Sequence, residues 1–448
     1  MIKKQRRGVS VMQVIAIGFF LLILAGTALL CLPVSSRARR FTPISDAAFT
    51  ATSAVCVTGL VVVDTGSYWS VFGQAVILCL IQIGGLGFMT IATQFYLLMR
   101  RKIGLRARET LSESISSTQL GGVVRLSQKI VAGTALIEGA GAVLLALRFC
   151  PQFGLGRGLW FAVFHSVSAF CNAGFDLLGG VFEPYCSFVH YAADPLVILT
   201  LSALIIVGGI GFVVWDDVTR FGLHWKRYHL HSKLVLVTSA LLLGGGTLLF
   251  WLLERSATSA GMHAGGQLLA ALFDAVTPRT AGFNAVPTDQ LSNGGKLLTI
   301  MLMHVGGSPG STAGGVKTTT WAVLVLYAVS YVKNRPSFGV FGRRLDPACL
   351  HRASVVLALN LLLPLFASML IAGLEPIPLT DVLFEAFSAI GTVGMTTGIT
   401  RALGPFSRAA LMLLMYLGRV GSVSFAFALA ERKAPPRVTN PVEQITIG

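Results

Sequence analysis

Four glycine-centred turns recur along this 448-residue chain at nearly equal spacing. Their central residues are Gly59, Gly174, Gly282 and Gly394, so successive turns lie 115, 108 and 112 residues apart. A short apolar segment precedes each turn, and a longer apolar stretch follows it. Because the same order of segments occurs four times, the sequence predicts a fold built from one unit repeated four times.

The composition indicates that these units lie in a membrane. Of all residues, 54% are hydrophobic and only 12% are charged, whereas soluble domains carry about 25% charged residues. A bilayer core of about 30 Å requires about 20 apolar residues in a helix. Eight stretches meet this requirement, the sixth of them with an interruption: 13–32, 71–99, 130–149, 195–216, 234–253, 295–331, 353–373 and 407–430.

The net charge of +16 is concentrated in a few places. Most basic residues fall at the two ends of the chain and after every second apolar stretch, at 3–7, 100–129, 220–233, 333–352 and 432–437. All five groups would then lie on one face of the membrane, and the positive-inside rule makes that face cytoplasmic. The distribution favours a topological role for the charge over a nucleic-acid partner, and it predicts that both termini are cytoplasmic.

A shorter apolar segment lies between the members of each pair of long stretches and ends at a glycine turn. The four segments are 44–55, 158–170, 266–276 and 380–389. They are too short to span a bilayer and are typical of re-entrant pore helices. The predicted fold is therefore an all-α polytopic membrane protein with eight transmembrane helices, in which outer helix, pore helix, turn and inner helix recur in pseudo-fourfold arrangement. The predicted repeats are 1–99, 100–218, 219–332 and 333–448, the last with a cytoplasmic C-terminal tail.

The pore-helix segments align by their distance from the glycine. An aromatic residue stands ten residues before the glycine in three repeats, at Phe49, Phe164 and Phe384. A serine stands six residues before it in the same repeats, at Ser53, Ser168 and Ser388. In the third repeat Phe273 precedes Gly282 by nine residues and Thr277 takes the place of the serine, so this unit is one residue shorter.

Irregular backbone at membrane depth persists only where it is buried in protein or lines a water-filled cavity. Four turns around one axis can form a ring of backbone carbonyl oxygens that replaces the hydration shell of a cation. Glycine suits such a turn because it tolerates a positive φ and a close approach of backbones. One such turn would favour an ordinary loop glycine, but four at repeat spacing favour a cation filter. The predicted filter residues are Val57, Thr58, Gly59, Cys171, Asn172, Ala173, Gly174, Thr280, Ala281, Gly282, Thr392, Val393 and Gly394.

The third inner stretch is interrupted by a segment rich in glycine. Five glycines and a proline within ten residues cannot propagate a helix, so a polar loop is expected midway through this span and in none of the other inner helices. We interpret the loop as a gate below the filter, with a mere kink as the alternative. The predicted gate comprises Gly306, Gly307, Ser308, Pro309, Gly310, Ser311, Thr312, Ala313, Gly314 and Gly315, together with Lys317 and Arg419.

Arg419 stands in the fourth inner stretch where the first two repeats have the second glycine of a pair, Gly85 and Gly209. A charge in an apolar helix costs about 2.5–3.5 kcal/mol on insertion scales, so its side chain should face the bundle interior. It would either pair with loop carbonyls or hydroxyls and hold the gate shut, or form an electrostatic barrier to cations. Snorkelling to the membrane interface is the alternative.

Other classes of function find less support. The seven cysteines form no CxxC pair and show no spacing typical of metal ligands, so no metal is predicted beyond a transported cation. No nucleophile or paired carboxylate stands where an enzyme would need it, and the chain is predicted not to be an enzyme. A secondary transporter that binds a small solute through broken helices is the main competing class. Four units leading to glycine turns, with few acidic residues in the spans, favour the pore.

With these motifs assembled, the chain resembles the TrkH/KtrB superfamily of bacterial potassium transporters, which has fungal Trk and plant HKT relatives. The resemblance is strongest to KtrB, because the TrkH branch generally adds two N-terminal helices. It covers nearly the whole chain, through VTGLVVVDTG at 57–66, IQIGGLGFMT at 81–90, FCNAGF at 170–175, AVTPRTAGFN at 275–284, GGSPGSTAGGVKTTT at 306–320 and GRVG at 418–421.

The resemblance implies K⁺ uptake across the bacterial plasma (inner) membrane by a homodimer with a channel-like fold. It also implies a cytosolic regulatory ring of RCK type, of the KtrA or TrkA class, which binds the nucleotide in place of this chain and controls the gate. The filter glycines and the carbonyls just before them would bind K⁺. Sodium-selective HKT members carry serine at the first filter glycine, so Gly59 favours potassium, while a dependence on Na⁺ stays open.

Overall fold

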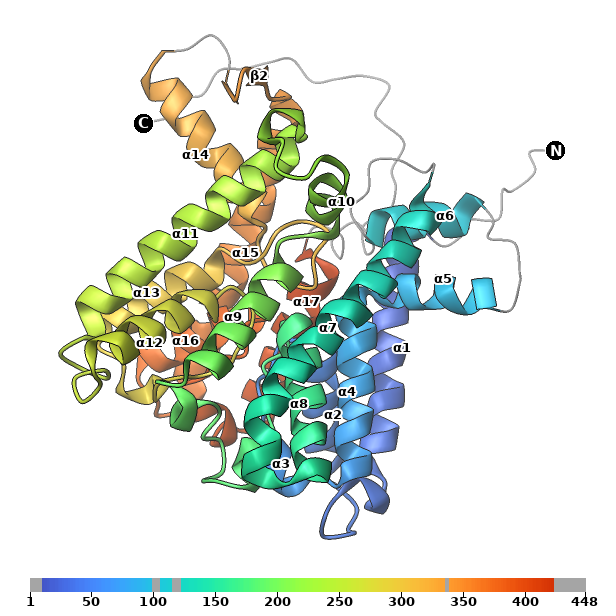
Figure 1. The fold of residues 1–448 in the computed structure, drawn as a ribbon, viewed down its shortest axis with the longest axis vertical. Helices are drawn as coiled ribbons and strands as arrows, with labels where there is room; N and C mark the ends of the chain where they lie inside the picture. Colours follow the sequence, from blue (N-terminus) through green and yellow to red (C-terminus); the bar gives the residue numbers. More distant parts are fainter. Residues whose placement is uncertain (1–9, 99–104, 115–121, 335–337, 423–448) are drawn as a thin grey trace.

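The computed structural model describes residues 10–98, 105–114, 122–334 and 338–422 (Figure 1). The predicted basic stretches at 3–7 and 432–437 lie outside the described residues, as does the C-terminal tail from residue 423. Within the described ranges the only strands are β1 (Gly339–Val340) and β2 (Arg343–Arg344), which pair antiparallel in a short hairpin. The rest of the regular structure is helical, and the predicted all-α membrane fold is confirmed.

Four long helices correspond to the predicted outer helices: α1 (Val11–Cys31), α7 (Val123–Phe153), α11 (Leu230–Glu254) and α15 (Pro347–Leu374). Local signals explain where two of them begin. Ser10 and Gln13 form a reciprocal capping box at the start of α1, whereas Asp346 caps α15 and Pro347 occupies its first position. All four helices are long and apolar enough to cross a membrane.

Four short helices correspond to the predicted pore helices: α2 (Ile44–Cys56), α8 (Leu155–Phe170), α12 (Ala264–Val276) and α16 (Leu379–Gly391). Each packs against the outer helix that precedes it in the chain. The phenylalanines aligned from the sequence are all completely buried: Phe49, Phe164, Phe273 and Phe384. Burial of one large aromatic side chain in each helix explains why a phenylalanine recurs nine or ten residues before every central glycine.

The first three predicted inner stretches are each divided into two helices, and the fourth is described only as far as residue 422. The first forms α4 (Val71–Leu86) and α5 (Phe88–Leu98), and the second forms α9 (Pro195–Gly209) and α10 (Phe212–Phe221), with a bend of 97° between them. The third forms α13 (Asn293–His304) and α14 (Thr318–Val332), separated by the glycine-rich loop. The fourth forms α17 (Pro405–Val420), which ends at Gly421.

Glycine causes the additional breaks. Gly87 and Gly211 have φ values of 81° and 101°, a region in which a right-handed helix cannot continue, and Gly421, the C-cap of α17, has a φ of 92°. Among the described residues a long polar loop interrupts only the third inner stretch, whereas the first two are divided at a glycine, a division that was not predicted from the sequence. Of the described helices, four are each long and apolar enough to span a membrane, or five if the bent pair α9–α10 counts as one span. The other predicted spans are divided into shorter helices or extend beyond the described residues.

The four units pack in a closed cycle. Each inner helix contacts the short helix of the next unit: α4 contacts α8, α9 contacts α12, α13 contacts α16, and α17 contacts α2. The last contact joins the fourth unit to the first, and the short helices therefore converge on a common centre. In Figure 1, α6 (Leu105–Ser114), α10 and β2 lie at one end of the molecule, and α3 (Thr65–Tyr68) lies at the opposite end.

Short 3₁₀ segments complete the connections. They are Pro33–Ser35, Leu178–Gly180, Val189–Tyr191, Trp225–Arg227, Thr288–Gln290 and Ile399–Arg401. Four of them, Leu178–Gly180, Val189–Tyr191, Thr288–Gln290 and Ile399–Arg401, follow a glycine turn and precede the next inner helix. They therefore belong to the connection that leads out of each of these turns.

Candidate functional site

Each short helix ends in a turn with the same backbone pattern. The residue two before the central glycine has a left-handed conformation in all four turns, with φ of 57° at Val57, 58° at Asn172, 74° at Thr280 and 50° at Thr392. The central glycines also have positive φ, between 69° and 97°. A left-handed conformation costs a residue with a side chain about 1–2 kcal/mol. Because the left-handed conformation recurs at the same position of all four turns despite this cost, it is a structural requirement of the turn.

The four turns lie against one another in cyclic order. A Cβ atom added to Gly59, Gly174, Gly282 or Gly394 would lie no more than 2.7 Å from a carbonyl oxygen of the next turn. These oxygens belong to Ala173, Ala281, Val393 and Thr58, in that order. Because the fourth glycine meets the first turn, the backbones form a closed ring with no room for a side chain at the glycine positions. All thirteen predicted filter residues are buried at or directly beside this ring.

A hydroxyl group from each short helix holds the turn that follows it. The Ser53 and Ser388 hydroxyls accept hydrogen bonds from the backbone N–H of Gly59 and Gly394, each at 3.0 Å. The Ser168 and Thr277 hydroxyls donate to the carbonyls of Phe175 and Phe283, each at 2.7 Å. The third unit is one residue shorter, yet Thr277 makes the same bond as its counterpart in the second unit. The serine register read from the sequence thus marks the anchors of the turns.

Replacing Ser388 with alanine should destabilise the protein. The change would leave the N–H of Gly394 buried without its partner, which costs about 1–3 kcal/mol. We expect the thermal unfolding transition of the purified protein in detergent to move to a lower temperature. Ser368→Ala is the matched control, because the buried Ser368 hydroxyl on α15 has no hydrogen-bond partner among the described residues. Equal transitions for the two variants would show that the anchor bond contributes nothing.

Acidic and amide side chains support two of the turns from behind. Behind the second turn, the Cys171 thiol lies 3.5 Å from the Gln82 amide oxygen and 3.8 Å from the Glu138 carboxylate, and the Gln82 amide nitrogen donates to Glu138 at 3.2 Å. Behind the fourth turn, Glu385 accepts hydrogen bonds from Thr396 and from the backbone N–H of Thr400. Sequence reasoning missed these residues. An acidic residue inside an apolar stretch was the available signal, since such groups are rare and functional in membranes.

The glycine-rich loop between α13 and α14 lies beneath the ring and contacts the second unit. Ser308 and Thr312 donate their backbone N–H groups to the carbonyls of Gly209 and Gly208, at 3.0 and 3.3 Å. The loop carbonyl of Gly310 accepts from the N–H of Phe212 at 2.7 Å, which provides a partner for an N–H freed by the break after α9. The loop is therefore tied to the broken inner helix of the neighbouring unit, and most of it is buried.

Two cationic side chains bind the same loop. Arg419 donates to the Thr312 carbonyl of the loop and, at 3.0 Å, to the Gly85 carbonyl of the first unit. Lys317 donates to the Ala313 carbonyl at 2.7 Å. In this arrangement the Arg419 guanidinium points into the bundle and pairs with a carbonyl of the loop. Arg419, which belongs to the fourth unit, therefore connects the loop of the third unit to the first unit.

A cavity of about 620 Å³ lies on the other side of the ring. All four central glycines line it, so the cavity opens directly onto the four turns. Four carboxylate side chains also line it, from Asp64, Asp176, Glu183 and Asp289, against the single arginine Arg401. Such an excess of negative charge in a concave site concentrates cations at its floor.

Comparisons with known proteins agree with this geometry. The family model described as TrkH, cation transport protein, matches residues 10–434. The potassium/sodium uptake protein NtpJ of Enterococcus hirae is 41% identical, with 100% of this chain and 99% of that protein covered. The Ktr system potassium uptake protein B of Bacillus subtilis is 38% identical, with 94% of this chain and 93% of that protein covered.

A solved structure has the same fold. The potassium transporter TrkH from Vibrio parahaemolyticus superposes with a TM-score of 0.72 at 17% identity, covering 96% of this chain and 86% of that one. The family predicted from the motifs is confirmed, and with it the prediction of a transporter rather than an enzyme. This chain belongs to the TrkH family of membrane cation transport proteins.

Proposed function

We propose that this protein takes up K⁺ through a pore whose selectivity filter is the ring of four glycine turns. The closed ring beneath an acidic cavity is the observation that carries this proposal. Cations gathered by the cavity carboxylates would meet carbonyl oxygens at the level of Gly59, Gly174, Gly282 and Gly394, which can replace their water. The repeats 1–99, 100–218, 219–332 and 333–448 would each contribute one quarter of the filter.

The loop 306–315 would act as the gate of this pore. It lies below the ring and is held by Arg419, Lys317 and the carbonyls of α9, so it stands in the path of an ion that has passed the filter. Opening would require these hydrogen bonds to break. The Arg419 and Lys317 side chains hold the loop through only a few hydrogen bonds. A regulator therefore needs to supply only a few kcal/mol to open the loop.

The proposal extends to the membrane in which the protein lies, to its orientation there and to its partner subunits. We place the protein in the bacterial plasma membrane with both termini in the cytoplasm, since the basic segments in and around α6, α10 and β2 lie at the end opposite to α3. The Ktr system protein from Bacillus subtilis is named as part of a multi-component system. We propose a homodimer that works with a cytosolic RCK-type ring of the KtrA or TrkA class, which binds the nucleotide. Na⁺ is the second ion to test, because NtpJ is named for both ions.

Rescue of a bacterium that lacks its own K⁺ uptake systems tests the proposal. The chain, expressed with its regulatory subunit, should restore growth at low external K⁺ and should accumulate Rb⁺ and K⁺ faster than Na⁺. Uptake of each ion should be measured with and without the regulatory subunit. Failure to restore growth in cells whose membranes contain the folded protein would refute K⁺ uptake, and faster uptake of Na⁺ than of K⁺ would refute the selectivity.

K⁺ uptake should weaken in mild acid because of Asp176. Burial and the nearby carboxylate of Asp64 raise the pKa of Asp176 to about 7, from its ordinary value of 3.8. The side chain is therefore charged above pH 7 and becomes neutral below it, so the cavity loses one negative charge between pH 8 and pH 6. We expect initial Rb⁺ uptake at limiting concentration to fall about two- to fivefold over this range.

Two variants separate this effect from a general effect of acid. Asp176→Asn should show the lower uptake at both pH values and no step between them. Asp289→Asn removes another carboxylate of the same cavity, so it should lower uptake at both pH values and keep the step. A step of the same size in Asp176→Asn would assign the titration to a different group.

A further inference from the structure

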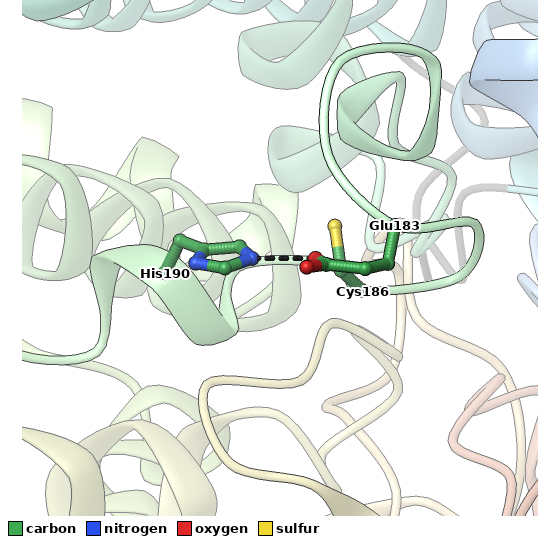
Figure 2. A group of neighbouring side chains, drawn as sticks. All are labelled: Glu183, Cys186 and His190. Carbon is green, nitrogen blue, oxygen red and sulfur yellow. Dashed lines mark hydrogen bonds and ion pairs between the residues drawn. The ribbon is translucent and has the colours of Figure 1, made fainter.

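Three metal-ligating side chains meet in the wall of the cavity, on the connection between the second turn and α9. Figure 2 shows the Glu183 carboxylate and the His190 imidazole facing each other and joined by a hydrogen bond, with the Cys186 thiol beside the Glu183 side chain. The Glu183 Oε2 and His190 Nε2 atoms are 2.8 Å apart, and one donor atom from each of the three residues lies within 4.8 Å of the other two. All three residues line the cavity above the ring.

The donor set matches a particular class of metal. A carboxylate, a thiolate and an imidazole are the ligands that zinc takes in proteins, with bonds of about 2.0–2.3 Å in a tetrahedral arrangement. Such bonds separate neighbouring ligand atoms by about 3.3–3.8 Å, so the three side chains need to move by about 1 Å. Glu183 and His190 can do so because their side chains are 76% and 42% exposed.

We propose that Glu183, Cys186 and His190 bind one Zn²⁺ ion, or the softer Cd²⁺, and leave a fourth coordination position for water. Binding places the metal where the hydrogen bond between carboxylate and imidazole now stands, and the proton of the Cys186 thiol goes to solvent. The spacing of three and four residues matches none of the familiar cysteine patterns. The three residues come together because the chain turns at the 3₁₀ segment Val189–Tyr191, which brings His190 back to Glu183.

The position of the site suggests what the metal does, and this step rests on the proposed K⁺ uptake. A divalent ion bound in the wall would offset part of the negative charge supplied by Asp64, Asp176 and Asp289. The concentration of K⁺ at the filter would fall as a result. Extracellular zinc would therefore inhibit uptake from the same side as the substrate.

Binding can be measured on the purified full-length protein without any transport. Titration with Cd²⁺ should produce the ultraviolet absorption of one cadmium–thiolate bond per chain, and Zn²⁺ should displace it. Cys186→Ser should abolish this absorption, and His190→Gln or Glu183→Gln should weaken Cd²⁺ binding at least about tenfold. Cys349→Ser is the matched control, because Cys349 is an exposed cysteine at the start of α15, outside the three-residue cluster. The proposal is overturned if the absorption persists in Cys186→Ser, or if both other variants bind like the parent.

Measurements of transport then test whether the bound metal inhibits uptake. Each variant's Rb⁺ uptake with Zn²⁺ is compared with its own uptake in the presence of a chelator. The parent and Cys349→Ser should be inhibited, and Cys186→Ser should resist the same concentration of Zn²⁺. Equal inhibition of the parent and Cys186→Ser would overturn the inhibitory role. If no form of the protein transports Rb⁺, the proposed function fails, while the cadmium titration still decides whether the metal site exists.

Discussion

Gly174→Ser should strongly reduce selective K⁺ uptake. The residue has a φ of 69°, and a Cβ atom there would lie 2.7 Å from the Ala281 carbonyl oxygen and 3.0 Å from the Cα atom of Gly282. The new side chain must push the second and third turns apart or move one of the carbonyls. Strain of this kind costs about 1–3 kcal/mol. Since about 1.4 kcal/mol changes an equilibrium tenfold, we expect uptake of Rb⁺ in proteoliposomes to fall by about five- to a hundredfold.

The design of this experiment separates a damaged filter from a damaged fold. Gly139→Ser is the matched control, because a Cβ atom on this exposed glycine of α7 would have no neighbour within 4 Å. Both variants should elute as the parent does in gel filtration before their fluxes are compared. Na⁺ competition adds a second readout, since a widened ring should lose its preference for K⁺ over Na⁺. Unchanged uptake and unchanged preference in a folded Gly174→Ser protein would remove the turns from the permeation path.

The parts of the site that the sequence could predict are those set by local chemistry. Glycine, phenylalanine and serine recur at fixed distances because each makes the same local contact: a positive φ, a buried aromatic ring and a hydroxyl bonded to the turn. Because these contacts are local, the residues that make them recur at regular positions, and the four units could be aligned from the sequence alone. Even the shorter third unit kept its anchor, because Thr277 supplies the same hydroxyl one residue closer.

Contacts between residues far apart in the chain produce no such regular pattern in the sequence. The bond from the loop at Ser308 to Gly209 joins residues 99 positions apart, and nothing in either segment indicates the other. The breaks at Gly87 and Gly211 were missed for a different reason. A glycine in an apolar helix is compatible with close packing as well as with a break. Only the surrounding backbone decides which occurs.

Arg419→Ala should raise the rate of K⁺ uptake. The guanidinium holds the loop through the Thr312 carbonyl and ties it to the Gly85 carbonyl of the first unit. A hydrogen bond to a charged group contributes about 1.5–3 kcal/mol, so its loss should shift the balance toward the open loop by about ten- to a hundredfold. Initial Rb⁺ uptake should therefore increase severalfold in proteoliposomes without the regulatory subunit, where the closed loop limits the flux.

Two further arginine variants decide how Arg419 acts. Arg408→Ala is the matched control on the same helix, since Arg408 pairs with Asp46 and does not contact the loop in the described structure. It should leave the flux near that of the parent. Arg419→Lys keeps the positive charge but loses the planar fork that reaches two carbonyls at once. If Arg419 acts by holding the loop, the lysine variant should conduct nearly as well as the alanine variant. If it acts as an electrostatic barrier, lysine should restore the low flux of the parent, and the gate would then be the charge rather than the bond.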